Sequence, residues 1–301
     1  MGVIQGLGNV TEEARHGAVA VGVFDGVHWG HRAIFERLQE VAAEKGIGTV
    51  ALTFDKHPSE LLAPDKAPPY VCTLDQRIEL IQAAGVEQIV VAEFDAALAN
   101  LTREEFAAQV LHDALHARHI VVGGNFRFGK ERKGDIRYLN SAGPALGMGV
   151  SVVSSVIIGG APVSSTRIRS LICRGEMEDA AKLLGRRFAL RGTVVTGDHS
   201  GRALGFPTAN IQTAPRQLLP GRGVYAVEVT IGGSAYNGLC NVGCRPTFGC
   251  LAEIVEVHLV GFTGDLYGTT LDVVFVRKLR DEIAFESPEE LVEQIKRDLE
   301  M

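Results

Sequence analysis

Apolar residues recur in two different rhythms along the chain, and the rhythm changes near residue 185. Before that point, short β-branched runs alternate with segments whose apolar positions repeat at helical spacing. This order is typical of βαβ units, in which helices cover both faces of a parallel sheet. The first half is therefore predicted to be a doubly wound α/β domain. Its expected strands are Ala18–Phe24, Thr49–Phe54, Gln88–Phe94, His119–Gly123 and Val150–Ile158.

Helix signals lie between these strands. Apolar residues every three or four positions indicate an amphipathic helix, and a following glycine typically ends it. A Thr with a Glu three residues later can satisfy the free N–H groups of a helix start as a capping box. The expected helices contain Ile34, Leu38, Val41 and Ala42 before Gly46, span Asp75–Ala84 before Gly85, and run from the Thr102/Glu105 box to His116.

After Gly185 the rhythm changes to short strands separated by Gly, Pro and Asn, which predicts an antiparallel barrel or sandwich. No long linker separates the two rhythms, so we expect domains of residues 1–185 and 186–301. The expected strands of the second domain are Phe188–Val195, Gly223–Ile231, Ala235–Val242, Ile254–Phe262 and Thr270–Arg277.

A terminal helix is expected after these strands. Ser287-Pro288-Glu289-Glu290 has the spacing of a capping box, with Pro at the first helical position. Leu291, Ile295 and Leu299 would then share one face of the helix. We expect this face to pack on the barrel.

Composition and charge narrow the class of protein. The chain has 301 residues, which corresponds to two domains at about 150 residues each. Its 30 Lys and Arg against 36 Asp and Glu give a net charge of −6, which disfavours coating nucleic acid or an anionic membrane. No stretch reaches the roughly 20 apolar residues of a membrane span. The five cysteines include no C-x-x-C pair, so neither a disulfide framework nor a structural zinc site is expected. We expect a soluble cytoplasmic protein without nucleic-acid or membrane partners.

The segment from Gly22 to His31, GVFDGVHWGH, stands where the first strand ends and the first helix begins. In a doubly wound sheet, ligands bind at this edge. His28 and His31 would lie in the first helical turn, whose N–H groups and dipole attract phosphate. Two imidazoles there can donate hydrogen bonds to an α-phosphate whose charge grows as it is attacked. For two histidines at this spacing alone, a solvated helix start or a metal pair is the alternative.

A second segment, Ser164–Arg169 (SSTRIR), follows the last strand of this half and combines hydroxyls at a cap position with two guanidiniums. Together with the histidine segment it resembles the two signatures of the nucleotidylyltransferase superfamily, in which a mobile second loop clamps the triphosphate. Residues 124–131 have the spacing of a P-loop, but Glu131 stands where a Ser or Thr hydroxyl would hold magnesium. A carboxylate there would repel phosphate, so we reject a P-loop.

The second half contains a different set of polar residues. Residues 197–210, GDHSGRALGFPTAN, are rich in glycine and end in Thr208 and Asn210, which can offer a hydroxyl and an amide oxygen to Mg²⁺ beside a nucleotide phosphate. A turn stabilised by Thr and Asn is the alternative. Residues 241–248, NVGCRPTF, are expected to form a second loop. Glu256 lies in an apolar strand and is either a barrel-exterior residue or a positioned base.

Over nearly its whole length, the chain resembles the prokaryotic bifunctional riboflavin kinase/FAD synthetase family. This resemblance implies a Rossmann-like N-terminal nucleotidylyltransferase domain and a C-terminal antiparallel β-barrel with a terminal helix. The segments similar to the FAD synthetase module are Gly22–His31, Thr53–Pro58 (TFDKHP), Gly123–Gly129 and Ser164–Arg169. Those similar to the flavokinase barrel are residues 201–210, GVYAV (Gly223–Val227), residues 241–248, VEVH (Val255–His258) and DLYG (Asp265–Gly268).

The resemblance implies two ATP-dependent steps from riboflavin to FAD. In residues 186–301, riboflavin would be phosphorylated to FMN: Thr208 and Asn210 would bind Mg²⁺ and phosphate, and Glu256 would orient or deprotonate the ribityl hydroxyl. In residues 1–185, FMN would attack the α-phosphate of a second ATP and release pyrophosphate. The small-molecule partners are therefore ATP, riboflavin and FMN.

The resemblance also assigns residues to each site. For the adenylyltransferase, the ATP- and phosphate-binding residues would be Gly22, Phe24, Asp25, Gly26, His28, His31, Asn125, Ser164, Thr166 and Arg167. For the kinase, the ATP-binding residues would be Gly197, Gly201, Gly205, Thr208, Asn241, Gly243, Pro246 and Thr247. Phe54, Pro58 and Phe128 are candidates for lining the FMN ring, with core packing as the alternative.

Two positions depart from the family pattern. Asn125 replaces a frequent Asp, which should alter contacts without abolishing activity, and Gly261 replaces a common acid after VEVH, which changes a loop contact but does not touch Glu256. Two further functions stay open: a chain with only one active half, and a flavin-binding or regulatory protein without catalysis. No sequence feature defines an oligomeric state.

Overall fold

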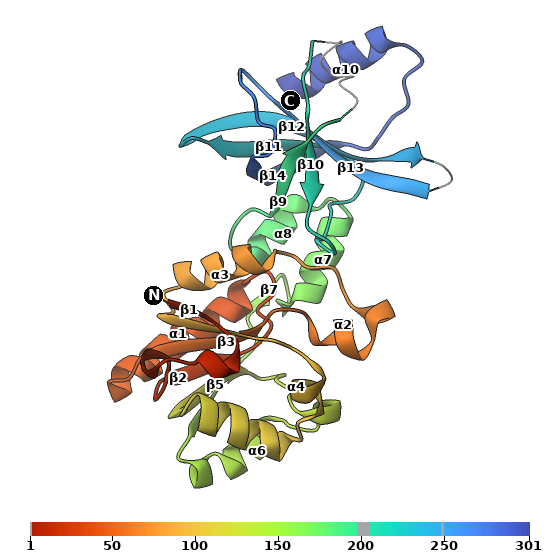
Figure 1. Ribbon diagram of the computed structural model, residues 1–301. Coiled ribbons are helices and arrows are strands. Elements are labelled where there is room, and N and C mark those ends of the chain that lie inside the picture. The colour runs from red at the N-terminus through yellow and green to blue at the C-terminus, as the bar shows by residue number, and fades with distance from the viewer. Residues whose placement is uncertain (1, 198–204, 248–249) are drawn as a thin grey trace. The chain divides into compact units, whose positions relative to one another are not determined.

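The computed structural model of the chain describes residues 2–197, 205–247 and 250–301, with side chains at all of these positions except 245–247 and 250–252 (Figure 1). The described residues form two compact units. One comprises Met1–Pro68 and Leu74–Ser164, and the other comprises Pro69–Thr73 and Ser165–Met301. Helices α7 (Ser165–Cys173) and α8 (Met177–Leu184) thus belong to the second unit, although they precede residue 185. The functional boundary at residue 185 stays a prediction.

A six-stranded parallel sheet forms the centre of the first unit, in the order β1-β4-β3-β2-β5-β6. From β2 the chain adds β3 and β4 on one side, then returns to add β5 and β6 on the other. The doubly wound prediction is therefore confirmed. The edge strand β1 was not predicted, because four residues are too few to reveal a period. The strands are β1 Gly2–Gln5, β2 Ala18–Val21, β3 Thr49–Phe54, β4 Gln88–Ala92, β5 His119–Gly123 and β6 Gly149–Val153.

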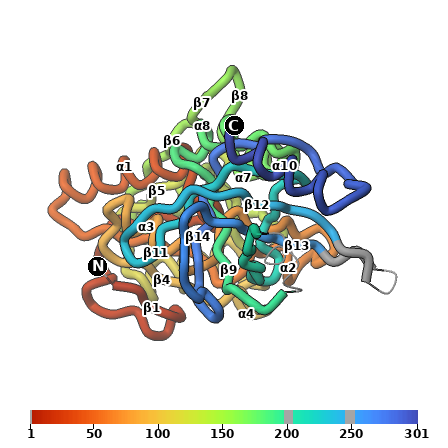
Figure 2. The backbone as a smooth tube through the Cα atoms, turned by 90° about the horizontal axis from the view of Figure 1, so that it is seen from above, coloured from red at the N-terminus to blue at the C-terminus, as the bar shows by residue number. Residues whose placement is uncertain are grey.

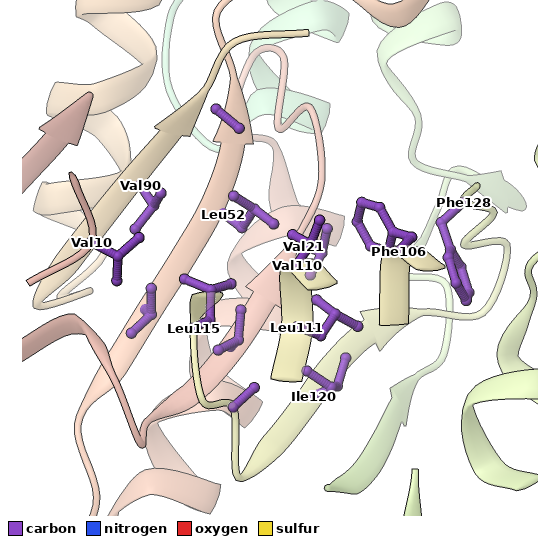
Figure 3. Packing of buried hydrophobic residues seen from close by; sticks show 14 of the residues in the cluster. Val10, Val21, Leu52, Val90, Phe106, Val110, Leu111, Leu115, Ile120 and Phe128 are labelled. Atoms are coloured by element: carbon purple, nitrogen blue, oxygen red, sulfur yellow. The ribbon is translucent and has the colours of Figure 1, made fainter. Parts of the chain in front are cut away.

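Buried apolar side chains fill both faces of this sheet. On one face, Val21, Leu52 and Ile120 pack with Phe106 and Leu111 of a helix (Figure 3). Alternate strand residues point to the other face, where they pack against α1 and α3. The helices of the unit are α1 Trp29–Lys45, α2 Pro58–Leu62, α3 Leu74–Ala83, α4 Ala96–Asn100, α5 Arg103–Glu105, a π-helix Phe106–Ala114 and α6 Ile136–Ala142. Short 3₁₀ turns are Leu7–Asn9, Glu12–Ala14, Pro64–Lys66, Lys130–Arg132 and Pro144–Leu146.

The predicted helix signals operate as expected at two ends. Gly46 follows α1 in the left-handed conformation with φ 63°, which a side chain would disfavour. Thr102 and Glu105 form a reciprocal capping box at the start of α5. Beyond Glu105, however, the backbone widens into a π-helix, so the expectation of one regular helix to His116 was wrong in type.

Three predicted strands of the first unit are shorter than expected, and one of them, Gln88–Phe94, ends at Ala92. The first strand in the chain ends at Val21 instead of Phe24, because the following residues turn away from the ladder. The segment Val150–Ile158 is interrupted after Val153, and Ile157–Ile158 (β7) forms a small hairpin with Ala161–Pro162 (β8), which Figure 2 traces. Its two-residue turn consists of Gly159 and Gly160, both at positive φ.

A closed six-stranded antiparallel barrel forms the second unit, in the order β10-β13-β12-β11-β14-β9. Of the two predicted architectures, the barrel is confirmed. The strand β10 was not predicted, because Pro207 just before it has no N–H for strand pairing and is a local turn signal. Residues 241–247, predicted as a loop, instead continue β12, which stays paired with β13 up to Thr247. The strands are β9 Ala189–Val195, β10 Ala209–Thr213, β11 Gly223–Ile231, β12 Ser234–Thr247, β13 Cys250–Leu259 and β14 Thr270–Arg280.

The terminal helix α10 (Pro288–Glu300) is present, with two differences from the prediction. Ser287 Oγ accepts a hydrogen bond from the backbone N–H of Glu290, but the Glu290 carboxylate accepts from Glu286 N, so the box is half formed. Leu299 is 37% exposed, whereas Asp298 is only 3% exposed. The last turn of the helix therefore buries a carboxylate where the sequence suggested a leucine.

Candidate active sites

The carboxyl ends of β2 and β5 mark the switch point of the parallel sheet. The two strands are neighbours, with Ala20 opposite Val121, yet the chain leaves them toward opposite sides of the sheet. Loops that leave such a pair diverge and open a crevice in which ligands bind. The segment from Gly22 to His31 and the turn that contains Asn125 both start at this edge.

The loop after β2 is held in an uncommon backbone conformation. Phe24, Gly26 and Val27 have φ values of 52°, 82° and 37°. Phe24 and Val27 are buried in the core, which fixes these left-handed residues despite their side chains. A Cβ at Gly22 would lie 2.9 Å from the Phe24 ring, so only glycine fits there. Asp25 is 3% exposed and is thus part of the folded loop.

The two histidines lie together at the start of α1. His28 is the N-cap residue, and its ring stacks on that of His31 with 3.7 Å between centroids and 16° between planes. The His31 ring also meets the Phe24 ring edge-on at 5.3 Å. A Cβ at Gly30 would lie 3.1 Å from Cε1 of His28, so this glycine leaves room for the stack. Both imidazoles are thus gathered where the helix presents its free N–H groups.

The remaining nucleotide residue of this unit lies at the same sheet edge. Asn125 is exposed in the turn after β5. A Cβ at Gly123 would lie 3.6 Å from Oδ1 of Asn125, in ordinary contact, so the turn itself does not require that glycine for space. The structure therefore brings Asn125 to the predicted edge, while a contact with nucleotide stays a prediction.

The three candidate flavin residues have different surroundings. Phe54 ends β3, is 8% exposed, and meets Phe94 edge-on at 5.5 Å. Phe128 is 6% exposed and stacks on Phe126 with 5.4 Å between centroids. Both belong to the hydrophobic core of the unit. Pro58 is the first residue of α2 and is half-buried. Core packing therefore accounts for the two phenylalanines, and a flavin contact stays a prediction.

The second signature segment spans the change of unit. Ser164 is the last residue of the first unit, and α7 starts at Ser165 as the sequence predicted. Thr166 is exposed and Arg167 is half-buried. Arg169 Nε donates to the Pro69 carbonyl at 2.7 Å. One of the two guanidiniums therefore has a structural role.

The barrel assembles its polar residues through strand register. Asn210 of β10 lies opposite Glu256 of β13, which in turn lies opposite Asn241 of β12. Directly opposed residues project from the same face of a sheet, so the three side chains form one row. The flanking residues Val255 and Val257 are buried. The row therefore lies on the opposite, outer face of the barrel wall.

The thiol of Cys240 shows the electrostatic influence of this row. Burial raises the pKa of Cys240, and the negative charge of Glu256 raises it further. Burial also raises the pKa of Tyr225. Both groups stay neutral at physiological pH, so Cys240 serves as a packing residue and not as a nucleophile.

Two cavities lie in this part of the barrel, and one of them is lined by members of the row. One of about 270 Å³ is lined by Thr208, Asn241 and Glu256 together with apolar residues of α10 and its approach, Ile283, Phe285, Leu291 and Ile295. Another of about 530 Å³ is lined by Thr208, Pro207 and Ala209 and by residues 262–267. Thr208 is the residue that lines both cavities.

The predicted glycines of the kinase site have distinct surroundings. A Cβ at Gly197 would overlap the amide of Asn210, and one at Gly243 would overlap the carboxylate of Glu282. Gly205 has φ 85°, which favours glycine. Gly201 lies outside the described residues. Pro246 and Thr247 belong to β12, but their side chains lie outside the described part of the chain.

Two charged residues near the sites were not singled out from the sequence. Arg77 of α3 is 1% exposed, and Asp298 of α10 forms a buried ion pair with Arg280, with Nη2 and Oδ2 2.9 Å apart. Gln294 Nε2 also donates to Asp298, at 2.9 Å. Each residue occupies an apolar-stripe position of its helix, three after Leu74 and three after Ile295. A charge on an apolar stripe is the signal that could have found them.

Neither a metal cluster nor a membrane span is found in the described parts of the chain. Among these residues, no group of three or more His, Cys, Asp or Glu side chains is arranged to hold a metal ion. Likewise, no helix there is both long and apolar enough to cross a bilayer. Neutral oxygens such as those of Thr208 and Asn210 suit a Mg²⁺ ion held chiefly by substrate phosphates.

Comparisons with known proteins match each half of the chain to an enzyme family. The FAD synthetase family model matches residues 10–167, and the riboflavin kinase model matches residues 184–301. The bifunctional riboflavin kinase/FMN adenylyltransferase of Escherichia coli K12 is 38% identical, over 99% of this chain and 96% of that protein. The Bacillus subtilis protein with the same description is 35% identical, over 96% of this chain and 92% of its own length.

One solved structure covers 99% of this chain and 97% of its own, with a TM-score of 0.89 and 32% identity; it is described as a macrolide-efflux protein from Streptococcus pneumoniae. Its likeness supports the fold. The two family matches and the full-length relatives leave no support for a single active half or for a non-catalytic flavin binder. The chain belongs to the bifunctional riboflavin kinase/FMN adenylyltransferase family and is a transferase that makes FMN from riboflavin and FAD from FMN.

Proposed function

We propose that adenylyl transfer takes place at the switch point between β2 and β5. An FMN phosphate oxygen attacks the α-phosphorus of ATP, the bond to the β-phosphate oxygen breaks, and pyrophosphate leaves. His28 and His31 stabilise the charge that develops on the α-phosphate. The observation that carries this assignment is their stacked arrangement at the N-terminus of α1.

Further residues assist this step. The loop of Gly22, Phe24, Asp25 and Gly26 surrounds the phosphates, and Asn125 contacts the nucleotide. Ser164, Thr166 and Arg167 bind the leaving pyrophosphate, for which hydroxyls and a planar guanidinium are suited. Phe54, Pro58 and Phe128 shape the flavin side of the site.

For the kinase step, we propose that riboflavin binds in the cavity of about 270 Å³ and ATP in the cavity of about 530 Å³. A base must reach the hydroxyl that it activates, and Glu256 lines only the first of these two cavities. Its carboxylate orients the ribityl hydroxyl and accepts its proton as the oxygen attacks the γ-phosphorus of ATP. The bond from this phosphorus to the bridging oxygen breaks, and ADP leaves. Thr208, which lines both cavities, stands where the transferred phosphoryl group would pass. The other proposed ATP contacts are Gly197, Gly201, Gly205, Asn241, Gly243, Pro246 and Thr247.

Mg²⁺ is the proposed cofactor of this site. When bound, it would neutralise charge on the phosphates of ATP. The Thr208 hydroxyl and the Asn210 amide would hold it. A Cβ at Gly197 would overlap the Asn210 amide, so this glycine leaves room for the amide, which supports the proposal.

We assign the adenylyltransferase to residues 1–185 and the kinase to residues 186–301, in the cytoplasm. The four cysteines with described side chains, Cys72, Cys173, Cys240 and Cys244, are free thiols, which supports a reducing compartment.

The division of labour is tested by two variants of the full chain. His28→Ala should convert riboflavin to FMN and stop, whereas Asn210→Ala should fail to make FMN but convert supplied FMN to FAD. Chromatography of the flavins after incubation with ATP and Mg²⁺ measures both. If either variant, still folded, lost both reactions, the assignment of one step to each site would be wrong.

A further inference from the structure

A guanidinium is buried behind the loop that leads to the two histidines. Arg77 is 1% exposed, and its Nη1 donates to the carbonyls of Val23 at 2.8 Å and Phe54 at 2.9 Å. It also donates to the hydroxyl of Thr53 at 3.1 Å. That hydroxyl in turn donates to the Val23 carbonyl at 3.1 Å. One side chain of α3 therefore ties together the ends of β2 and β3.

These carbonyls lie where the sheet can no longer bond them. The register of β2 with β3 ends at the pair Val21 and Leu52, and Gly22 N makes one further bond to the Leu52 carbonyl. Val23 has already left the ladder. Buried carbonyls require a donor, and hydrogen bonds from a charged donor are stronger than those between neutral groups. Arg77 thus supplies hydrogen bonds in place of those between β2 and β3, at the point where the loop leaves the sheet.

The residues just after Val23 are the ones that need such support. Phe24 and Val27 are left-handed despite bearing side chains, a conformation that lasts only when its surroundings hold it. The Phe24 ring contacts the His31 ring, and His28 follows Val27 directly. A shift of the Val23 carbonyl would therefore displace the stacked imidazoles, His31 through its contact with Phe24 and His28 through the backbone at Val27.

We propose that Arg77 is a positioning residue for adenylyl transfer, which holds the loop from Val23 to Val27 so that His28 and His31 meet the transition state. This inference rests on the proposed location of the reaction at these histidines. Arg77 acts through the backbone of the loop. Its loss should therefore lower turnover more than it weakens ATP binding, because misplaced transition-state groups reduce kcat.

The test is a steady-state comparison of Arg77→Met with the wild-type chain. We expect adenylyl-transfer kcat to fall about 100-fold, the scale for a displacement of about 1 Å in a site, with KM for ATP changed by less than about threefold. Riboflavin kinase turnover by the same preparation should be unchanged, which serves as an internal measure of folding. Arg77→Lys keeps a charged donor but lacks the planar guanidinium, so its adenylyl-transfer kcat should be about tenfold higher than that of Arg77→Met.

Ile81→Val is the matched control, because Ile81 lies on the same helix and is fully buried in the core that packs against α3. It should lower the melting temperature while leaving adenylyl transfer within about twofold. Three results would overturn the positioning role. They are an effect of Arg77→Met on KM for ATP alone, an equal loss of adenylyl-transfer rate in Ile81→Val, and an equal loss of adenylyl-transfer and kinase rates in Arg77→Met. Assaying His28→Ala in parallel distinguishes the site assignment from the positioning role of Arg77. If His28→Ala retained FAD formation, the site itself would be misassigned. If Arg77→Met were fully active while His28→Ala was inactive, only the positioning role would be refuted.

Discussion

The two candidate sites differ in what they are made of. At the switch point of the sheet, the backbone dominates: a helix start, left-handed residues, and Gly22 and Gly30, where a side chain would meet a ring. In the barrel, strand register dominates and aligns Asn210, Glu256 and Asn241 in one row. Adenylyl transfer should therefore be sensitive to added atoms next to the loop, and phosphorylation to the identity of single side chains.

The largest expected effect is at the base of the kinase site. Glu256→Gln keeps the shape of the side chain but removes its proton acceptor, so riboflavin phosphorylation should fall about 1,000-fold. FAD formation from supplied FMN should continue at the wild-type rate. The control is Glu253→Gln, an exposed residue of the same strand. Comparable kinase rates in the two variants would show that Glu256 is no base.

The next effect concerns added atoms at the histidine pair. Gly30→Ala brings a methyl group 3.1 Å from the His28 ring, which must move, and adenylyl transfer should fall about 30-fold with the kinase unaffected. Gly8→Ala is the matched control, because nothing lies within 4 Å of a Cβ there. Rates of FAD formation from FMN measure both. Equal activity of the two variants would contradict the backbone-built site.

A smaller effect is expected where α10 docks on the barrel. Asp298→Asn leaves Arg280 without its charged partner and should lower the free energy of unfolding of the barrel by about 2 kcal/mol. This is less than for a fully buried pair, since the Arg280 side chain keeps 18% exposure. KM for riboflavin should rise, because Leu291 and Ile295 of this helix line the cavity. Thermal unfolding and kinase kinetics measure these two changes. An unaltered KM for riboflavin would show that α10 does not contribute to riboflavin binding.

The smallest effect is on the pH dependence of stability. Burial, and then the charges of Lys45 and Arg37, lower the pKa of His119 in β5. The unfolded chain therefore binds a proton below about pH 6.5 that the folded chain does not, so stability is full above that pH and is lost as the pH falls. His119→Gln should flatten the decline in melting temperature between about pH 7 and pH 5. An unchanged slope would assign the decline to other groups.

The sequence predicted the parts of the fold that depend on local signals. Strands such as Thr49–Phe54 and the glycine stop at Gly46 follow from period and turn chemistry, and the structure confirms both. The strand β10 and the extension of β12 through residues 241–247 were missed, because pairing with β13 outweighs the local signals of Pro and Gly. Pairing between strands that are far apart in the sequence cannot be recognised from a short stretch of residues.

The sites, too, were predicted where local sequence signals define them and missed where they depend on long-range contacts. The histidine pair was found because strand, glycine and helix start adjoin in the sequence. The alignment of Asn210 with Glu256 depends on register between β10 and β13, which local patterns do not determine. Arg77 and Asp298 stand on the apolar stripes of their helices, but only the structure shows that they are buried and what they bind.

The central claim is that two independent sites perform the two steps, and mixing two variants tests it most directly. His28→Ala alone should convert riboflavin only to FMN, and Asn210→Ala alone should leave riboflavin unchanged. An equimolar mixture with ATP and Mg²⁺ should produce FAD, because FMN released by one chain is adenylylated by the other. A mixture of folded variants that makes FMN but no FAD would contradict the account.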